Sequence, residues 1–343
     1  MTKICLISDT HYGARGDNPH FYNYQKKFIQ NVFLPYLKKY DINHVVHLGD
    51  LVENRRQLNI QTGARLREDF LEPLDALDID VNMLAGNHDV FYRSTNSINI
   101  LNEITKQYYN FKMHTDLPTH INIDGTKILL VPWISPENKV SSLEIIKNSD
   151  AKYCMGHLEL KGFEQTKGRI SINGEDKGIF GRFDSVFSGH YHIRSHGGNV
   201  FYIGSAFHFN WGDCNNFCGF MVLDTASGKM DWIKNPYKIF TKLEYDESNI
   251  CDIRLAKDTY CRVNVVNKIS EAKFNDFINS IHELGVIDLL VDEKVSKIEV
   301  NVEEDIEVND DSIFKKTIET LDFPYRSELL LLADEIQREA INL

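Results

Sequence analysis

The residues best suited to chemistry are carboxylates, histidines and one asparagine, each found just after a short apolar run. They are Asp9, His11, Asp50, Asn87, His88, His157, His190 and His192. Carboxylate oxygens mixed with imidazole nitrogens suit Mn²⁺, Fe²⁺ or Zn²⁺. Asp9-x-His11 and His190-x-His192 each place two donors on one extended segment, where residues two apart face the same way. Two cations about 3.5–4 Å apart need a shared anion, and Asp50, alone on its loop, is the natural bridge.

A single histidine in an apolar setting has a simpler explanation, because most such residues are ordinary core histidines. His47 is expected to be one, and His196 and His208 are expected to be surface groups or groups that only support the ligands. Single Gly-Asp or Gly-His pairs also occur by chance. Five such segments follow one another along the chain, each after an apolar run, and this favours a functional site over a chance arrangement.

Short buried strands are the elements that must position these side chains. The apolar runs are Ile4–Ile7, Val45–Leu48, Val81–Ala85, Tyr153–Met155 and Val186–Ser188. Helical patterns separate the first of them, at Tyr24–Tyr40 with a break expected at Pro35, at Thr62–Leu77 and at Ser97–Tyr109. Strands alternating with helices predict an α/β fold, in which sites form past the carboxyl ends of the strands.

Further strands follow without long helices between them. Lys127–Trp133, Asn199–Ile203 and Gly219–Leu223 are the candidates, and a second sheet facing the first is the simplest arrangement. Four regions are therefore expected: a catalytic domain over residues 1–238, a small α+β capping domain over 239–298, an acidic linker over 299–311, and a helical tail over 312–343.

Composition narrows the class of protein. Of 343 residues, 42% are hydrophobic, which excludes a chain disordered throughout. The net charge of −12 argues against coating nucleic acid by bulk electrostatics, but not against a metal-dependent enzyme acting on phosphodiesters. No run approaches the roughly 18 apolar residues of a membrane span. The amino-terminal residues predict no signal peptide, which together with only six cysteines points to a reducing compartment. Cys214 and Cys218 are expected to be free thiols rather than zinc ligands.

Taken together, the five segments resemble the motifs of calcineurin-like metallophosphoesterases. The motifs are Asp9-x-His11, Gly49-Asp50, Gly86-Asn87-His88-Asp89, Gly156-His157 and Gly189-His190-x-His192, spread over about residues 3–235. Within that superfamily the chain resembles the SbcD nuclease group of double-strand-break repair, through Leu130–Trp133, Gly156–Phe163 and Tyr202–Ser205. Ala206 stands where many members of that group have proline. This difference concerns the shape of the local loop and not the metal ligands. The resemblance implies a two-sheet αββα sandwich with a capping domain and a C-terminal helical tail.

The resemblance also implies roles for the residues. One metal would take Asp9, His11, Asp50 and His192, and the other Asp50, Asn87, His157 and His190. The two divalent ions would be Mn²⁺, with Mg²⁺ as the alternative, and would activate a hydroxide nucleophile. His88 matches the catalytic histidine, which donates a proton to the leaving oxygen or neutralises its charge. Glu53 either orients His88 or is a solvated loop carboxylate.

Substrate and partner follow from the same resemblance. The implied activity is that of a DNA nuclease subunit, exonuclease on duplex ends and endonuclease on single strands, working with an SbcC-type ABC ATPase. Candidate DNA contacts are Arg55, Arg56, Lys161, Lys167, Arg169 and Arg182, although scattered surface charge explains them equally well. The apolar face of the tail would dock on the coiled coil of the ATPase or pack on its own core, and consists of Leu329, Leu330, Leu332, Ala333, Ile336 and Ala340. Ser94–Tyr109 would form a homodimer interface.

Two rival functions remain at this stage. A phosphoprotein or nucleotide phosphatase has the same fold, but phosphoprotein phosphatases usually carry Gly-Asn-His-Glu, where this chain has Asp89. A scaffold that has lost catalysis is the other rival. The presence of every matched ligand counts against it.

Overall fold

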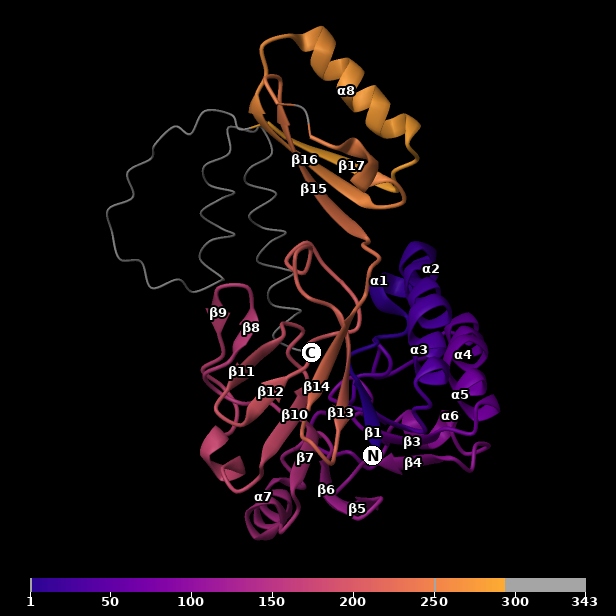
Figure 1. Ribbon diagram of the computed structural model, residues 1–343, viewed down its shortest axis with the longest axis vertical. Coiled ribbons are helices and arrows are strands. Elements are labelled where there is room, and N and C mark those ends of the chain that lie inside the picture. The colour runs from indigo at the N-terminus through magenta and orange to yellow at the C-terminus, as the bar shows by residue number, and fades with distance from the viewer. Residues whose placement is uncertain (1, 250, 294–343) are drawn as a thin grey trace, which may run out of the picture. The chain divides into compact units, whose positions relative to one another are not determined.

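Two sheets form the centre of the computed structural model, which describes residues 2–249 and 251–293 (Figure 1). Within that range the first sheet has the strand order β14-β13-β1-β2-β3-β4. The strands are β1 (Lys3–Ile7), β2 (His44–His47), β3 (Asp80–Leu84), β4 (Phe111–His114), β13 (Gly219–Asp224) and β14 (Met230–Lys234). β1 to β4 run parallel, and β13 pairs antiparallel with β1 and β14.

The second sheet has the order β11-β12-β10-β7-β6-β5. Its strands are β5 (Thr119–Ile123), β6 (Thr126–Val131), β7 (Tyr153–His157), β10 (Ser185–Gly189), β11 (Ser195–Gly197) and β12 (Val200–Tyr202). The four central strands are parallel, and the two edge strands are antiparallel to their neighbours. The prediction that Gly219–Leu223 belongs to this sheet is wrong. That segment is in β13 of the first sheet, where Leu6 pairs with Met221.

The alternation of side chains along β1 shows how the layers pack. Ile4 and Leu6 are fully buried between the two sheets, in a core that also contains Leu130 and Met155. Their neighbours Cys5 and Ile7 point the other way, into a core formed with the helices. A third core covers the outer face of the second sheet, beside α7 (Lys139–Asn148). The protein therefore has the predicted αββα sandwich.

The helices after β1 and β2 are interrupted where prolines occur. α2 (Pro19–Phe28) and α3 (Leu34–Lys39) are joined by the π-helical segment Ile29–Phe33. α4 (Ile60–Leu66) and α5 (Glu72–Ala76) are joined in the same way by Arg67–Leu71. Pro35 and Pro73 lack the N–H that a regular helix would use, so the wider turn comes just before each of them. The single turn α1 (Ala14–Asp17) precedes α2.

The predicted helix Ser97–Tyr109 is reduced to the single turn α6 (Leu101–Ile104). Asparagine side chains compete for the backbone here. Asn96 donates to the carbonyls of Thr115 and Trp133, and the side chain of Asn99 donates to the carbonyl of Asn96. Asparagine favours such local bonds over helix, which the apolar periodicity could not reveal.

A separate three-stranded parallel sheet follows, with order β15-β16-β17. It comprises β15 (Phe240–Asp246), β16 (Tyr260–Asn267) and β17 (Asp288–Glu293), with α8 (Glu271–Glu283) between the last two. Ser270 caps α8 by accepting from the N–H of Lys273. The predicted linker and tail, including Leu329 to Ala340, lie outside the described residues. Among the described helices none is long and apolar enough to cross a membrane.

Candidate metal centre

The predicted ligands meet because each follows the carboxyl end of a strand in one of the two sheets. Asp9 follows β1, Asp50 follows β2 and Asn87 follows β3, whereas His157 ends β7 and His190 follows β10. Several of these residues have left-handed backbone conformations, with φ of 51° at Asp9, 54° at Asp50 and 86° at His190. Such conformations are costly for residues other than glycine and cluster at functional sites. Here they turn the chain sharply enough to aim the side chains at one point.

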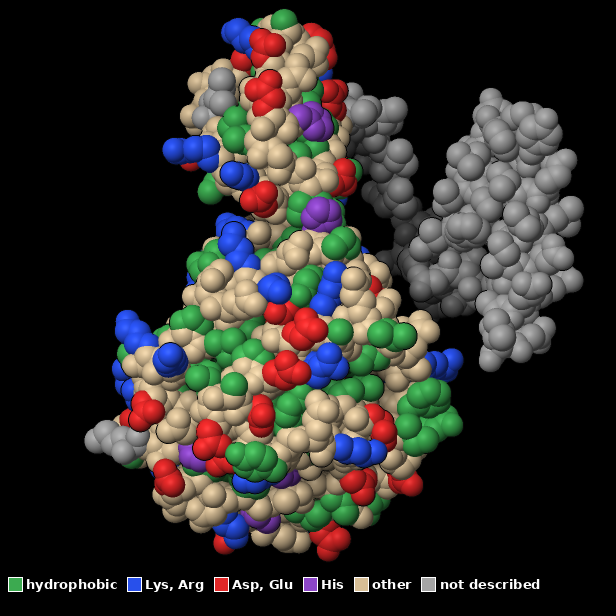
Figure 2. Space-filling model, turned by 90° about the vertical axis from the view of Figure 1, so that its right-hand side faces the viewer, with side chains coloured by type: hydrophobic (Ala, Val, Ile, Leu, Met, Phe, Trp, Pro, Cys, Tyr) green, Lys and Arg blue, Asp and Glu red, His purple; other side chains and the backbone are tan. Residues whose placement is uncertain are grey.

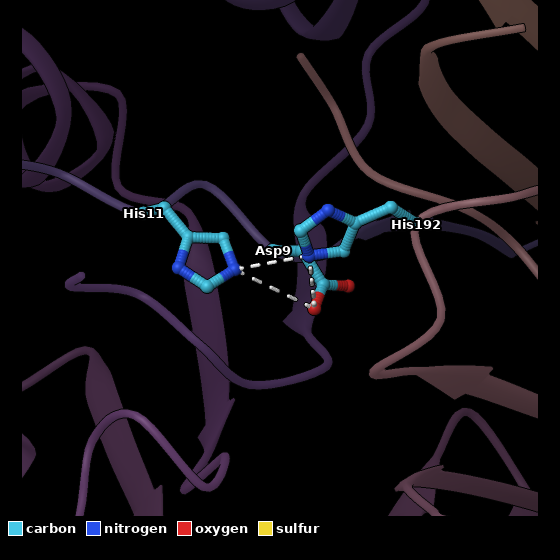
Figure 3. A group of neighbouring side chains, drawn as sticks. All are labelled: Asp9, His11 and His192. Atoms are coloured by element: carbon cyan, nitrogen blue, oxygen red, sulfur yellow. Dashed lines mark hydrogen bonds and ion pairs between the residues drawn. The ribbon is translucent and has the colours of Figure 1, made fainter. Parts of the chain in front are cut away.

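The first group of donors consists of Asp9, His11 and His192 (Figure 3). Figure 3 shows the three side chains directed toward one another, Asp9 and His11 from the loop after β1 and His192 from the loop after β10. Nε2 of His11 lies 3.2 Å from Nε2 of His192 and 4.0 Å from Oδ1 of Asp9. The Asp9 carboxylate also accepts from the backbone N–H of His190 at 3.2 Å, which ties the loops of the two sheets together.

The second group consists of Asp50, His157 and His190. Oδ1 of Asn87 lies 3.0 Å from Nε2 of His157 and 2.8 Å from Nδ1 of His190. His157 is oriented by its other nitrogen, which donates to the carbonyl of Leu48 at 2.8 Å. The structure thus places Asn87 in the group that the resemblance assigned to it.

Asp50 lies between the two groups. Its Oδ2 is 3.8 Å from Nε2 of His11 and 3.4 Å from Nε2 of His157. Its Oδ1 accepts from the backbone N–H of His88 at 2.7 Å. This position between the groups is the one required of a bridging carboxylate.

The donor set fits divalent cations. Nitrogen and oxygen donors converge in these two groups, and a third group of possible donors, His11, Glu53 and His88, shares His11 with the first. Nε2 of His11 faces Nε2 of His192 at 3.2 Å. Two buried carboxylates, Asp9 and Asp50, supply negative charge that would otherwise be costly to hide from water. A mixed imidazole and carboxylate set of this kind suits first-row divalent metals.

The electrostatics separate the histidines into two kinds. Burial lowers the pKa of His190 and of His192 to about 3, so both rings are neutral at pH 7 and their nitrogens are free to bind a metal. Burial also opposes the charge on His11, but Glu53 and Asp50 outweigh it and raise the pKa of His11 to about 9. Burial opposes ionisation of Asp50 as well, yet His157 and the other histidines hold its pKa well below the usual range.

The carboxylate of Glu53 contacts His11 rather than His88. Oε2 of Glu53 lies 2.8 Å from Nδ1 of His11, an ion pair with a candidate metal ligand. His88 is instead held by the backbone of the same residue, because its Nδ1 lies 2.6 Å from the carbonyl oxygen of Glu53. Glu53 thus contacts both histidines, His11 through its side chain and His88 through its main chain.

Sequence reasoning missed the structural part played by Asp89. This fully buried carboxylate accepts from the N–H groups of Leu51 at 2.9 Å, Val52 at 3.2 Å and Gly86 at 2.8 Å. It thereby joins the loop of Asp50 to the loop of His88. In the sequence Asp89 stands out only because phosphoprotein phosphatases usually have Glu after Gly-Asn-His. That difference separates classes of enzyme and does not indicate a structural role for the carboxylate.

Two aromatic side chains pack against the ligands and were also missed as site residues. The ring of Trp133 lies 5.2 Å from that of His190, and the ring of Phe209 lies 5.0 Å from His11 and 5.4 Å from His192. Trp133 belongs to a segment that the sequence comparison had already singled out. Phe209 lies shortly after Ala206, and nothing in the sequence marks it as a site residue.

The remaining histidines and cysteines lie apart from the centre. His47 is buried beside the hydroxyl of Thr10, and His208 is held by the hydroxyl of Tyr24. His196 is exposed and stacks on Phe201. Cys214 and Cys218 are buried free thiols, and neither belongs to a described group that could hold a metal.

The predicted DNA contacts fall into two sets. Arg55 and Arg56 line a hollow that includes His88. Of the others, Lys161 pairs with Asp176, Arg182 donates to a backbone carbonyl, and Lys167 and Arg169 are exposed on the hairpin of β8 (Glu164–Thr166) and β9 (Arg169–Ile170). On the face that Figure 2 shows, acidic and basic side chains are interspersed.

Comparison with known proteins defines the class. Residues 2–194 match the calcineurin-like phosphoesterase family, and the chain belongs to that family. Membership implies divalent metal ions, which agrees with the donor groups described above. Over 342 residues the chain is 30% identical to "Exonuclease subunit 1" of Enterobacteria phage T4, a match that covers 99% of this chain and 96% of that protein. This confirms the resemblance to the SbcD nuclease group that the motifs indicated.

Solved structures show more distant similarities. An archaeal phosphodiesterase is 15% identical with a TM-score of 0.36, over 68% of this chain and 99% of that one. The purple acid phosphatase PPD1 from yellow lupin (Lupinus luteus) seeds is 13% identical with a TM-score of 0.44, over 68% and 51%. At these scores neither similarity bears on function, and the family assignment rests on the sequence matches.

Proposed function

We propose that the protein is a Mn²⁺-dependent DNA nuclease subunit that hydrolyses phosphodiesters as an exonuclease on duplex ends and an endonuclease on single strands. The observation that carries the proposal is the pair of donor groups joined by Asp50, in a chain 30% identical along nearly its whole length to an exonuclease subunit. Mg²⁺ is the alternative metal.

The candidate ligands divide as the family pattern implies. Asp9, His11 and His192 would hold one cation, and Asn87, His157 and His190 the other, with Asp50 shared. When bound, two divalent cations polarise a phosphodiester and lower the pKa of a bound water.

His88 supplies the proton in this proposal. Its Nδ1 is held by the Glu53 carbonyl, which leaves Nε2 as the nitrogen available to the departing oxygen. The His88 backbone N–H, bonded to Asp50, fixes the distance between the acid and the shared carboxylate. The ion pair of Glu53 with His11 holds that ring in place as a ligand.

We also propose assembly with partners. The tail face of Leu329 to Ala340 would dock on the coiled coil of an SbcC-type ABC ATPase in the cytoplasm of a phage-infected bacterium, and residues 94–109 would pair two copies of the chain. Support for the second contact comes from exposed apolar side chains in that segment, with Ile98 55% and Tyr109 85% exposed. Sedimentation of the full chain, with Ile98→Asp as the variant, tests the dimer.

The test of function is release of nucleotides from end-labelled linear duplex DNA with Mn²⁺ and then with Mg²⁺. His88→Ala should abolish release, whereas His282→Ala, an exposed histidine of α8, should leave it intact. Hydrolysis of p-nitrophenyl phosphate without any release from DNA would point to a phosphatase instead. Failure of the wild-type protein to bind either Mn²⁺ or Mg²⁺ would point to a scaffold that has lost catalysis.

A further inference from the structure

A hollow of about 490 Å³ lies beside His88, outside the two donor groups. It is lined by Glu53, Arg55, Arg56, Phe91, Tyr92 and Arg93. Its volume is within the range of small-molecule and nucleotide sites. It is formed where two loops meet, one that follows Asp50 and one that follows His88.

Unpaired positive charge is the first feature of this hollow. Within residues 2–249 and 251–293, the guanidinium groups of Arg55, Arg56 and Arg93 form neither an ion pair nor a hydrogen bond. Other arginines are engaged, as Arg67 is with Glu72, Arg254 with Asp252 and Arg15 with the carbonyl of Phe209. Burial lowers the pKa of Arg55, and so does the charge of Arg93. Two guanidinium groups that repel each other in a chain of net charge −12 favour an anion as the missing neighbour.

An exposed aromatic ring is the second feature. Tyr92 is 49% exposed, and its edge-to-face contact with Phe91, at 4.7 Å between centroids, supports it from one side. The loop beneath is held in place, because the N–H of Phe91 donates to the carbonyl of Ile98 at 2.9 Å and Val90 bridges to Asn99. A supported but exposed ring among arginines is what single-stranded nucleic acid binds, by stacking its bases.

We propose that this hollow binds an unpaired nucleotide of the DNA strand next to the scissile phosphate, with Arg55 and Arg93 on its phosphate and Tyr92 stacked on its base. The inference rests on the proposed nuclease function and adds the substrate form. A base within a duplex is already stacked on its neighbours and cannot lie on Tyr92, so the site selects single strands and frayed ends. The Glu53 carboxylate also faces this hollow, but its charge is paired with His11 at 2.8 Å.

The test compares two labelled phosphorothioate strands of equal length, dT15 and an abasic strand, by fluorescence anisotropy on the full chain with Mn²⁺. The wild type should bind dT15 more tightly than the abasic strand. Tyr92→Ala should weaken dT15 by about fivefold or more and leave the abasic strand unaffected, whereas Tyr92→Phe should bind as the wild type does. Arg55→Ala and Arg93→Ala should weaken both strands alike and make binding less sensitive to salt.

Matched controls are Tyr40→Ala and Arg67→Ala, which remove an exposed tyrosine and an exposed arginine outside the hollow. Equal binding of the two strands by the wild type, or dT15 binding that is insensitive to Tyr92→Ala, would overturn the inference. So would a Tyr92→Ala variant that changes the sedimentation of the protein instead of its DNA binding, because the ring would then belong to a contact between subunits.

Failure of the proposed function looks different. Hydrolysis of bis(p-nitrophenyl) phosphate and of linear DNA is measured on the same preparations. Base-dependent binding without hydrolysis of either compound would retain the site and remove the nuclease. DNA cleavage by a wild type that shows no base-dependent binding would retain the nuclease and remove the site.

Discussion

Removing the Glu53 side chain should weaken metal binding rather than disable His88. The carboxylate contacts Nδ1 of His11 at 2.8 Å, whereas His88 is held by the backbone carbonyl of Glu53, which any substitution retains. In Glu53→Ala the His11 ring loses the partner that keeps its Nε2 turned toward Asp9 and His192. The ring is then free to rotate, and the charge that makes it a stronger ligand is gone.

The size of the effect follows from the exposure of the carboxylate. Loss of a group that orients a metal-binding histidine typically costs about 10–100-fold in metal affinity. The Glu53 side chain is 42% exposed, so water replaces part of the contact in the variant. The lower end of the range, about tenfold or ~1.4 kcal/mol, is therefore expected. Glu53→Gln keeps an acceptor without the charge and should lose about half of that free energy.

Calorimetric titration of the full chain with Mn²⁺ measures this directly, with Glu144→Ala as an exposed control. Turnover of bis(p-nitrophenyl) phosphate at saturating Mn²⁺ should largely recover in Glu53→Ala, because His88 is still held. Unchanged Mn²⁺ affinity, together with a loss of turnover as severe as that of His88→Ala, would refute the reasoning. The carboxylate would then act on His88, which is one of the two interpretations that the sequence allows.

Three further predictions concern the supporting structure. Asp89→Asn places an amide N–H₂ against backbone donors and should lower the free energy of unfolding by about 2–3 kcal/mol in urea titrations; unchanged stability would mean that the three bonds to Asp89 contribute little. Gly49→Ala should cost roughly 2–4 kcal/mol and weaken Mn²⁺ binding, because φ is +100° and a Cβ would lie 2.4 Å from Nδ1 of His157; a wild-type melting temperature would contradict this. Burial, and then Lys112, lowers the pKa of His114 from 6.5 to about 4, so between these pH values the unfolded chain binds the extra proton and the protein loses stability as the pH falls. In His114→Gln the loss of unfolding free energy between pH 7 and pH 5 should be smaller by about 1–2 kcal/mol, and equal losses in the two proteins would show that His114 is not the group responsible.

The layered fold was predictable because its strands are short apolar runs that end in turn residues. Where packing and local bonding compete, periodicity failed. The segment 97–109 has helical spacing, but the side chains of Asn96 and Asn99 bond to backbone carbonyls and only Leu101–Ile104 is helical. The place of β13 was missed as well, since nothing in an apolar run says which sheet it joins.

The candidate ligands were predictable because their residue types and order along the chain are distinctive. The contacts that orient them were not. The side chain of Glu53 meets His11 and its carbonyl meets His88 because of how the loops pass one another, and the sequence alone does not distinguish these two contacts. Asp89 shows the same limit, because a buried carboxylate bonded to three backbone N–H groups cannot be distinguished in sequence from a catalytic one.

The geometry of the centre fits a metal site better than it fits a purely structural network. Asp9 and Asp50 are buried close enough that each disfavours the charge of the other, and both adopt left-handed backbone conformations that cost about 1–3 kcal/mol apiece. Hydrogen bonds from the backbone N–H groups of His190 and His88 reach these carboxylates, so they offset only part of the cost and leave Nε2 of His11 and Nε2 of His192 directed at each other. A purely structural network would pair those nitrogens with donors or acceptors of the protein. Positive charge supplied between them relieves the carboxylate repulsion and uses the imidazole lone pairs at once, and a divalent cation does both.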